Sequence, residues 1–508
     1  MKQIKTISLF LFLSCCMFSN NIFYKEIGVS KIYGCSSNFG IEFIKEKGDI
    51  NGDKILDFIV YKPGNNYYPS GKIWIFYGKS QEYPKEISVC NPNIEYSEID
   101  INYPYFAFQI NVSDFNKDGY DDLAFGKVLK YTGQIEERIY ILYGSSFFPS
   151  YIDLDNPPED LRASIFYNDD IEKYQYFGNV LEARDINFDG FEDLITSTAI
   201  FNHIYEEVIG EIYFFYGSSN RFPERIHLKN PELYYEKISV KNNQKGGAGS
   251  FKLLDINSDK YFDLVFPCLW DGFNNDREGA GKVVIIYSTI YGFPKIIDME
   301  NLPSRSTVIY GAKTYDSIGR KIFSEDINED KFNDIILCSS SASGPDKDRL
   351  DAGEIFILYS SGGNFQKVID LLYIKENYTY IIGDIERGYM GENISVGDLN
   401  EDGFTDLAIA SPFINNLAGR VTILYGKMSG WPKIIDFLNP PAEVEIFNIE
   451  GKEMYDFFGK GVEIIDLNGD NLFDLVFGSC KNRKENCNTP DCFYCEVNIY
   501  YNKNFKFR

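Results

Sequence analysis

Histidine is almost absent from this chain. Only His203 and His227 occur among its 508 residues, and they lie in unrelated sequence contexts. Histidine-based nucleophilic triads and histidine-ligated metal centres therefore lack the residues that they need. The glycine motifs of P-loops and of dinucleotide-binding proteins are missing as well. The sequence thus predicts no catalytic residues and no enzyme. The remaining alternative is a carboxylate- or calcium-assisted enzyme that acts on polysaccharides from a propeller scaffold.

Positive charge is also scarce. The chain has 50 Lys and Arg against 75 Asp and Glu, so its formal net charge is -25. No basic stripe is present that would meet the phosphates of a nucleic acid. Nucleic acid is therefore excluded as a partner.

Long apolar runs are missing beyond the N-terminus, so no transmembrane segment is expected. The run from Ile7 to Phe18 follows two lysines and is shorter than a membrane span, which is typical of a signal peptide. Residues 1–20 are therefore predicted to be a leader, and residues 21–508 a chain that is secreted or held at the cell surface or cell envelope. Leu13-Ser14-Cys15-Cys16 resembles a bacterial lipoprotein signal, so an N-terminal lipid anchor remains an open alternative.

One short acidic loop occurs seven times. It reads Asp, any residue, Asn, any residue, Asp, and then a further Asp four residues later. Successive copies begin 65 to 72 residues apart, a regularity that chance does not produce. The copies are Asp49/Asn51/Asp53/Asp57, Asp114/Asn116/Asp118/Asp122, Asp185/Asn187/Asp189/Asp193, Asp255/Asn257/Asp259/Asp263, Asp326/Asn328/Asp330/Asp334, Asp398/Asn400/Asp402/Asp406 and Asp466/Asn468/Asp470/Asp474.

Strand patterns surround each loop. Apolar runs such as Phe58-Ile59-Val60 follow the loops, and an alternating segment that ends in Tyr comes later, as in residues 73–77 and 421–425. No stretch shows a sustained helical period. A repeat of about 70 residues with roughly four strands is typical of one propeller blade. The sequence therefore predicts an all-β, seven-bladed β-propeller of four-stranded blades over residues 21–508.

The pattern resembles the FG-GAP repeats of integrin α subunits. Phe-Gly pairs open several repeats, for example Phe39-Gly40, Phe177-Gly178 and Phe458-Gly459, and Ala410-Ser411-Pro412 is close to the second signature of the family. The opening pair departs from the family pattern at Phe106-Ala107, Ile318-Gly319 and Met390-Gly391. The resemblance implies that calcium stiffens the blades and that other loops recognise a ligand. It favours a binding or adhesion module whose partner is an extracellular protein or a cell-surface glycan.

The oxygen spacing of the loops favours calcium. Calcium takes six to eight oxygen ligands in variable geometry, whereas magnesium prefers rigid octahedral sites and zinc prefers His or Cys. Side chains at loop positions 1, 3, 5 and 9 supply oxygens, and position 7 supplies its backbone carbonyl. Up to seven structural calcium ions are therefore expected. The position-7 residues, whose side chains are expected to turn toward the sheet core, are Ile55, Tyr120, Phe191, Tyr261, Phe332, Phe404 and Leu472.

Loop position 6 is expected to adopt a left-handed conformation. Gly119, Gly190 and Gly403 adopt it without strain, and Asn471 tolerates it. Lysine occupies the position in the first, fourth and fifth loops, as Lys54, Lys260 and Lys331. Lysine is strained there and adds positive charge beside the cation. These three loops are therefore predicted to bind calcium more weakly.

The N-terminal segment is predicted to close the ring. Residues 30–34 resemble the outer-strand segments between blades but precede the first loop, and few residues follow the last alternating strand. This segment should therefore supply the outermost strand of the seventh blade. Such pairing hides an exposed sheet edge.

The cysteines are predicted to act structurally. Cys480, Cys487, Cys492 and Cys495 crowd the last blade, where export favours disulfides over a redox pair. Cys35 is expected near them and within reach of a bond to Cys480 or a neighbour. Cys268 and Cys338 follow equivalent strands and are expected to be buried thiols.

Overall fold

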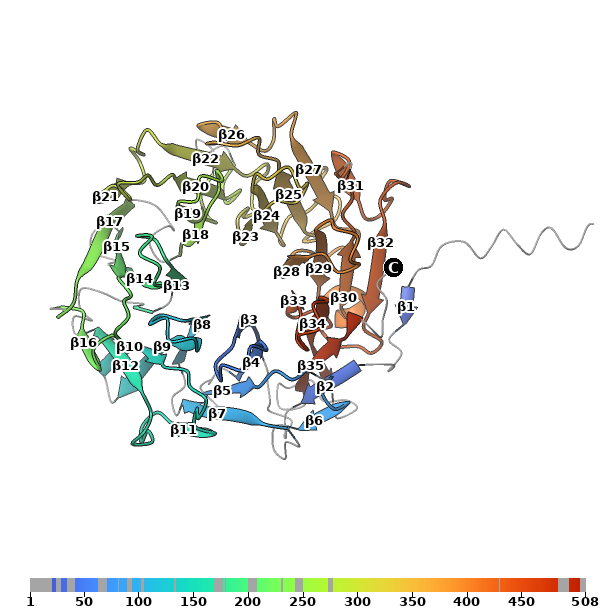
Figure 1. The fold of residues 1–508 in the computed structure, drawn as a ribbon. Helices are drawn as coiled ribbons and strands as arrows, with labels where there is room; N and C mark the ends of the chain where they lie inside the picture. Colours follow the sequence, from blue (N-terminus) through green and yellow to red (C-terminus); the bar gives the residue numbers. More distant parts are fainter. Residues whose placement is uncertain are drawn as a thin grey trace, which may run out of the picture.

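The computed structural model shows seven β-sheets arranged around a closed ring (Figure 1). This arrangement confirms the predicted seven-bladed all-β propeller. No helix in the described part of the chain is both long and apolar enough to cross a membrane. The structure describes residues 21–23, 29–33, 42–62, 71–80, 82–88, 94–101, 105–131, 134–168, 177–178, 180–199, 208–229, 232–242, 250–272, 277–428, 430–482 and 493–502.

Each blade contains an antiparallel sheet of four strands, which follow one another outward from the ring centre in chain order in blades 1 to 6. The innermost strands are β3 (Glu42–Gly48), β8 (Tyr105–Ser113), β13 (Leu181–Arg184), β18 (Lys252–Leu254), β23 (Lys321–Glu325), β28 (Ile394–Gly397) and β33 (Val462–Ile465). The second strands are β4 (Asp57–Lys62), β9 (Asp122–Tyr131), β14 (Asp193–Ala199), β19 (Asp263–Cys268), β24 (Asp334–Ser339), β29 (Asp406–Ser411) and β34 (Asp474–Asn482). The third strands are β5 (Gly71–Phe76), β10 (Gln134–Leu142), β15 (Val208–Phe215), β20 (Lys282–Ile286), β25 (Glu354–Leu358), β30 (Arg420–Leu424) and β35 (Phe493–Tyr500). The fourth strands are β7 (Tyr96–Ile101), β12 (Ala163–Asn168), β17 (Tyr235–Asn242), β22 (Ser306–Tyr310), β27 (Tyr378–Ile382), β32 (Ile446–Glu450) and, in blade 7, β2 (Val29–Tyr33).

A short fifth strand adds to the four strands predicted for each blade. Before its fourth strand forms, the chain of each blade runs along the outer edge of the preceding blade and pairs with it in parallel, as β21 does with β17. Neighbouring blades are therefore interlocked by main-chain hydrogen bonds. In the order of blades 1 to 7, the fifth strands are β11 (Tyr151–Asp153), β16 (Arg225–His227), β21 (Ile296–Asp298), β26 (Val368–Asp370), β31 (Ile434–Asp436), β1 (Asn21–Phe23) and β6 (Glu86–Ser88).

Helix is nearly absent from the described residues, as predicted. The helical element with both ends in the described residues is α1 (Ile414–Leu417), a turn between β29 and β30. Asn415 and Asn416 in this turn have left-handed φ angles of 52° and 60°. It is therefore an irregular turn rather than a stable helix.

The N-terminal segment closes the ring as predicted. Strand β2 pairs antiparallel with β35, with Val29 opposite Tyr500 and Tyr33 opposite Glu496. Strand β1 also pairs with β32 of blade 6, so the same segment interlocks blades 6 and 7. The hydroxyl of Ser30 donates to the carbonyl of Tyr83 over 2.6 Å, which joins blade 7 to the chain of blade 1.

The cysteine predictions are tested only in part. Cys268 and Cys338 are fully buried, as predicted. In blade 7, Cys480 lies opposite Cys495 in the β34–β35 register. The leader of residues 1–20 and the positions of Cys35, Cys487 and Cys492 lie outside the described residues.

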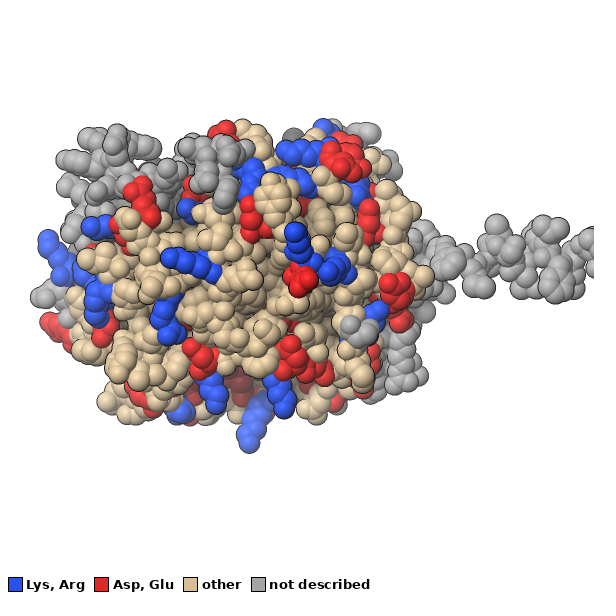
Figure 2. All heavy atoms as spheres, turned by 90° about the horizontal axis from the view of Figure 1, so that it is seen from above, with Lys and Arg blue, Asp and Glu red and all other residues tan. Residues whose placement is uncertain are grey.

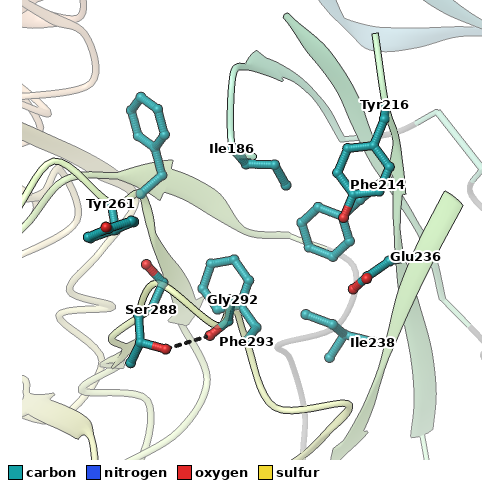
Figure 3. Close-up of a pocket in the computed structure, with 11 residues that line it drawn as sticks. Ile186, Phe214, Tyr216, Glu236, Ile238, Tyr261, Ser288, Gly292 and Phe293 are labelled. Atoms are coloured by element: carbon teal, nitrogen blue, oxygen red, sulfur yellow. Dashed lines mark hydrogen bonds between the residues drawn. The ribbon is translucent and has the colours of Figure 1, made fainter. Parts of the chain in front are cut away.

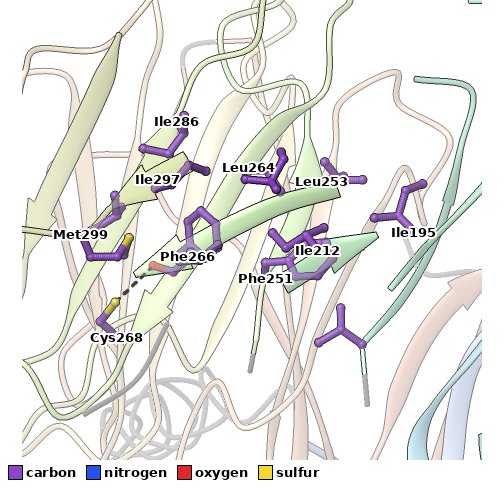
Figure 4. Packing of buried hydrophobic residues seen from close by; sticks show 14 of the residues in the cluster. Ile195, Ile212, Phe251, Leu253, Leu264, Phe266, Cys268, Ile286, Ile297 and Met299 are labelled. Carbon is purple, nitrogen blue, oxygen red and sulfur yellow. Dashed lines mark hydrogen bonds between the residues drawn. The ribbon is translucent and has the colours of Figure 1, made fainter. Parts of the chain in front are cut away.

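The core lies between blades rather than within one sheet. One cluster combines Ile195 and Ile212 of blade 3 with Phe251, Leu264 and Phe266 of blade 4 (Figure 4). The closure junction is built in the same way, from Phe58 and Trp74 of blade 1 and Val476 and Val497 of blade 7. Because each sheet is covered on both faces, its strands read as apolar runs.

Arginine side chains fasten the interlocking strands at two blade junctions. Arg349, in the turn before β25, donates from Nη1 to Asp436 Oδ1 over 2.6 Å and from Nη2 to Oδ2 over 3.0 Å. Asp436 ends β31, the fifth strand of the same blade. Arg277 holds Asp370 at the end of β26 in the same bidentate manner. Planar two-bond pairing of this kind orients as well as attracts.

Arg349→Ala is expected to lower the free energy of unfolding by about 2 kcal/mol. The loss leaves Asp436 and the carbonyl of Gly383 without their arginine donor. The effect is smaller than for a fully buried pair because the Asp436 side chain is 28% exposed. Arg387→Ala is the control, since the Arg387 side chain is 69% exposed. Equal losses of stability in urea denaturation of the two variants would contradict this account.

The same pair should make stability depend on acidity. Burial is the largest single effect and raises the pKa of Asp436, but the hydrogen bonds from Arg349, the hydrogen bond from the N–H of Leu438 and the charge of Arg349 together hold that pKa below its ordinary value. A lowered carboxyl pKa stabilises the fold above the unfolded-state pKa, and this contribution disappears as the pH falls through the folded-state pKa. Acidification through this range should therefore reduce the difference in the free energy of unfolding between the parent chain and Arg349→Ala.

Candidate metal sites on one face of the ring

The seven acidic loops occupy equivalent places in the fold. Each connects the innermost strand of its blade to the second strand, so all seven lie at the same end of the blades. Position 1 follows the innermost strand, and position 9 is the first residue of the second strand, as with Asp398 and Asp406. We call this side of the ring the loop face.

Inside each loop the polar side chains turn toward the backbone of the same loop. In blade 6, Asp398 Oδ2 accepts from the N–H of Gly403 over 2.8 Å, and Asn400 Oδ1 accepts from the N–H of Asp402 over 3.1 Å. Asp402 Oδ1 accepts from the N–H of Phe404 over 2.9 Å. The bond from position 6 to position 1 recurs in all seven loops. The sequence pattern therefore folds each loop in the same way.

Position 3 is brought next to position 1 in every loop. Its amide oxygen and the position-1 carboxylate both accept from the N–H of position 5. The position-1 residues are Asp49, Asp114, Asp185, Asp255, Asp326, Asp398 and Asp466. The position-3 residues are Asn51, Asn116, Asn187, Asn257, Asn328, Asn400 and Asn468.

Position 5 also makes the same hydrogen bond in every loop. Its carboxylate accepts from the N–H of position 7. In the first, third, fourth, fifth and sixth loops the position-3 amide also donates to this carboxylate. The position-5 side chains are exposed except in the fourth loop, where the residue is half-buried. The position-5 residues are Asp53, Asp118, Asp189, Asp259, Asp330, Asp402 and Asp470.

The position-9 carboxylates are fully or almost fully buried. Asp406 accepts one backbone N–H at each oxygen, from Leu399 and from Gly426, both over 2.8 Å. Burial, with a smaller contribution from the nearby charges of Asp402 and Asp398, raises the pKa of Asp406 to about 7, although these two hydrogen bonds lower it. In each of the other six loops, burial likewise raises the pKa of the position-9 carboxyl to about 7 or 8. The other position-9 residues are Asp57, Asp122, Asp193, Asp263, Asp334 and Asp474.

This donor set fits calcium. Hard oxygen donors from three carboxylates, an amide and a main-chain carbonyl are the groups that calcium prefers. A cation would also offset the burial of negative charge, which is otherwise unfavourable.

The predicted ligands do not, however, form a ready-made metal centre. Among the residues that the structure describes, no three His, Cys, Asp or Glu side chains stand ready as a metal-binding group. The oxygens at positions 1, 3 and 5 accept from the loop backbone instead, as Asn51, Asn116 and Asn187 do from position 5. Calcium binding by the 35 loop residues therefore remains a prediction.

Two positions in every loop, rather than one, adopt left-handed conformations. Position 6 does so as predicted, and position 4 does so as well, which the sequence analysis missed. The position-6 residues, with φ from 66° to 91°, are Lys54, Gly119, Gly190, Lys260, Lys331, Gly403 and Asn471. The position-4 residues, with φ from 57° to 76°, are Gly52, Lys117, Phe188, Ser258, Glu329, Glu401 and Gly469.

Substitutions at position 6 should change stability in opposite directions in two loops. Gly403→Lys is expected to lower the free energy of unfolding by about 1 kcal/mol, and Lys331→Gly to raise it by up to about 1 kcal/mol. No heavy atom lies within 4 Å of a Cβ placed on Gly403, so the effect there is backbone strain rather than a clash. The measurement is urea denaturation in metal-free buffer. Lys331→Ala removes the charge but keeps the Cβ; if it stabilises as much as Lys331→Gly, charge rather than strain is responsible.

The position-7 side chains do not enter the sheet core, which corrects that prediction. None is fully buried, and Phe332 is 37% exposed. At four junctions they contact position 4 of the preceding loop instead. Tyr120 packs on Gly52, Phe191 lies 5.6 Å from the Lys117 ammonium, Tyr261 lies 5.0 Å from Phe188, and Ile55 packs on Gly469. The loops therefore contact one another from blade to blade, including across the closure.

A second set of loops covers the acidic loops. We call the segment after each third strand the tip loop; in blades 2 to 6 these are residues 144–150, 217–224, 288–295, 360–367 and 426–433. The tip loop of one blade reaches the acidic loop of the preceding blade. Ser145 N–H donates to Ile50 O over 3.0 Å, and Asn257 donates to the side chain of Asn364 over 2.8 Å. Arg221 pairs with Asp118 over 3.4 Å, so the second loop already holds a positive charge that its own sequence does not reveal.

Two hollows lie beside tip loops. The larger, about 600 Å³, is lined by Tyr359, Phe365 and Tyr373 together with polar side chains such as Gln366 and Glu376. The smaller, about 60 Å³, lies between blades 3 and 4, and five of its eleven lining residues are aromatic (Figure 3). Aromatic faces combined with amide and carboxylate groups are suited to sugars, which offer both apolar faces and hydroxyls.

The comparisons with known proteins identify one repeat and two groups of relatives. Residues 390–424 match the FG-GAP repeat model. Phosphatidylinositol-glycan-specific phospholipase D of Rattus norvegicus is 22% identical over 426 residues, which cover 80% of this chain and 46% of that protein. The Dictyostelium discoideum protein of the same name is 27% identical over 200 residues, covering 36% of this chain and 20% of that protein. Integrin alpha-PS5 of Drosophila melanogaster is 28% identical over 245 residues, which cover 46% of this chain and 22% of that protein. The chain spans less than half the length of these curated relatives.

These matches confirm the resemblance to FG-GAP repeats and integrin α subunits. They contradict the prediction that no enzyme is involved, because several relatives are named as a phospholipase. The scarcity of histidine led to that error, since it says nothing about kinship with enzymes. His227, on β16, stacks on Tyr167 at 5.3 Å, and His203 lies outside the described residues.

Proposed function

We propose that this chain, a seven-bladed β-propeller in which residues 390–424 match the FG-GAP repeat, takes part in the hydrolysis of phosphatidylinositol-glycan lipids. The observation that carries the proposal is the match to phosphatidylinositol-glycan-specific phospholipase D over 80% of this chain. This function replaces the binding-only interpretation. It is nearer to the alternative of a carboxylate- or calcium-assisted, polysaccharide-active enzyme on a propeller scaffold.

The larger hollow, beside the tip loop of blade 5, offers a place for the glycan part of such a substrate. The larger hollow presents Tyr373, which is 71% exposed, beside the polar side chains of Gln366, Lys375 and Glu376. An aromatic face beside hydrogen-bonding groups can stack on a sugar and bind its hydroxyls. We place the glycan contact in this hollow.

Calcium has a structural part in this proposal. The side chains of positions 1, 3, 5 and 9 and the carbonyl of position 7 would hold it in each loop. Bound there, it would neutralise the clustered carboxylates and stiffen the tip loops that cover them. Export of the chain belongs to the same proposal, supported by the composition of its first 20 residues.

The proposal is tested with a glycolipid-anchored protein in detergent micelles. The purified chain is incubated with it in calcium, and the loss of the lipid is followed by phase partition, with binding measured in parallel. We expect lipid release or saturable binding that weakens in Tyr373→Ala. Tyr315→Ala is the control, because Tyr315 is 59% exposed on the opposite face. The proposal fails if neither release nor binding is detected, or if the two variants behave alike.

A second candidate is a binding function for an extracellular protein. The similarity to integrin alpha-PS5 favours it. It predicts capture of a protein ligand that is unaffected by an excess of free phosphatidylinositol-glycan. Competition by the glycolipid would instead support the first proposal.

A further inference from the structure

Three side chains project almost fully into solvent from the tip loops. Phe147 and Tyr291 are each 90% exposed, and Met428 is 83% exposed, more than any other large hydrophobic side chain in the described residues. They belong to blades 2, 4 and 6. Apolar groups in such positions lose contact with water only when a partner covers them.

These tip loops belong to the loop face. Each starts with a residue whose N–H donates to the position-9 carboxylate of its own blade. Gly144 donates to Asp122 over 2.9 Å, and Gly426 donates to Asp406 over 2.8 Å. Ser288 makes the same bond to Asp263 over 2.9 Å. The exposed apolar side chains and the acidic loops therefore share one end of the ring.

An aromatic patch lies on the same face between blades 3 and 4. Phe188, Tyr234 and Ile290 are 51%, 72% and 68% exposed. Phe188 packs on Tyr261 with ring centroids 5.0 Å apart, and Tyr234 stacks on Tyr216 at 5.3 Å. Tyr216 and Tyr261 line the smaller hollow (Figure 3). Tyrosine with one apolar and one polar end is the residue type found where lipid meets water.

The distribution of these groups favours a flat partner over a protein that fills one groove. The exposed apolar side chains come from blades spread around the ring, so only an extended surface can meet them together. Acidic and basic side chains are interspersed on the edge of the ring that Figure 2 shows, without a large basic patch. With a net charge of -25, the chain would repel anionic lipid headgroups unless cations lay between the two surfaces.

We propose that the loop face docks on a phospholipid bilayer with anionic headgroups, with Phe147, Tyr291 and Met428 entering the interface and calcium-filled loops facing the headgroups. This inference rests on the calcium occupancy given under the proposed function and adds the partner surface. A glycolipid substrate is anchored in such a bilayer.

The test measures co-sedimentation with vesicles. The full chain is mixed with phosphatidylcholine vesicles, with or without phosphatidylserine, in calcium or in EGTA. Binding is expected only with phosphatidylserine and calcium together. The triple variant Phe147→Ser, Tyr291→Ser, Met428→Ser should lower the apparent affinity roughly a hundredfold, because each side chain contributes about a factor of five through burial of apolar surface.

A matched triple variant on the opposite face is the control. Trp270→Ser, Tyr315→Ser, Met454→Ser removes side chains that are 62%, 59% and 55% exposed, and it should bind vesicles like the parent chain. Both triple variants should keep the parent melting temperature, since the substituted side chains are exposed. Equal vesicle binding by the two variants would overturn the inference.

The remaining outcomes separate this inference from its premise. If calcium raises the melting temperature but the parent chain does not sediment with vesicles, docking is refuted and the calcium proposal stands. If calcium changes neither the melting temperature nor the sedimentation with vesicles, the calcium proposal has failed. If the loop-face variant loses a protein partner while vesicle binding is absent, the face serves a protein, which also refutes docking on lipid.

Discussion

Removal of calcium is expected to lower the melting temperature by about 10 °C or more. A ligand that binds only the folded state adds about 2.7 kcal/mol per site when its concentration is a hundred times its dissociation constant, and seven sites multiply this contribution. Chelation also leaves the three carboxylates of each loop without a neutralising cation, and one of them, the position-9 group such as Asp406, is already buried. The measurement is a thermal melt in calcium and in excess EGTA, with the removal of metal verified.

Magnesium added after chelation is the control, because the same charge in a smaller ion should restore little of the lost stability. Within the set of loops, Asp402→Ala should be more destabilising in calcium than Asp53→Ala. Gly403 lets the sixth loop adopt its left-handed turn freely, whereas Lys54 in the first loop holds a φ of 70°. An identical melt with and without metal would refute structural calcium. The opposite ranking of the two variants would refute the position-6 argument alone.

Deletion of residues 21–33 is expected to give a chain that aggregates. The deletion removes β1 and β2 together, which strips the outer strands from blades 6 and 7 and exposes the edges of β32 and β35. It also removes Ile32, which is fully buried in the core between blades 7 and 1. An open edge beside an uncovered apolar face is a template for association with other chains. Size-exclusion chromatography with light scattering measures the outcome.

A point variant tests the same closure without shortening the chain. Ile32→Asp buries a charge in that core and should cost several kcal/mol in the free energy of unfolding. Ile296→Asp is its match, because Ile296 lies on the outer strand β21 and is 57% exposed. A monomeric, normally melting Ile32→Asp protein would show that β2 is dispensable for closing the ring.

The architecture was predictable because its signal repeats. One loop such as that of residues 398–406 says little, but seven at a constant spacing define seven blades and the end at which their loops lie. The closure by β2 followed from the same reasoning, since an outer-strand pattern without its own blade must complete another. The left-handed turn at position 6 followed from Gly119, Gly190 and Gly403, whose residue type reveals the conformation.

Other features left no such signal. Strands of three residues, for example β21 or β26, are too short to show a period, so the fifth strand of each blade was missed. The left-handed position 4 is held by a residue other than glycine in five of the seven loops, as by Lys117, Phe188 and Glu401, because the loop hydrogen bonds impose it. The aromatic residues at position 7 were expected in the core on hydrophobicity alone, yet Tyr120 and Tyr261 pack across to the neighbouring loop. The kinship with a phospholipase follows from similarity along most of the chain and from no single residue.

The interlocked strands have a consequence for a chain that has been cut. A protease that cleaves at residues 299–305, between β21 and β22, would separate the polypeptide into two pieces. Strand β21 would still be paired with β17 of blade 3, and β22 with β20 and β26 of blade 4. Neither piece can leave without opening a sheet. A nicked molecule should therefore migrate as an intact ring under native conditions and as two fragments only after denaturation.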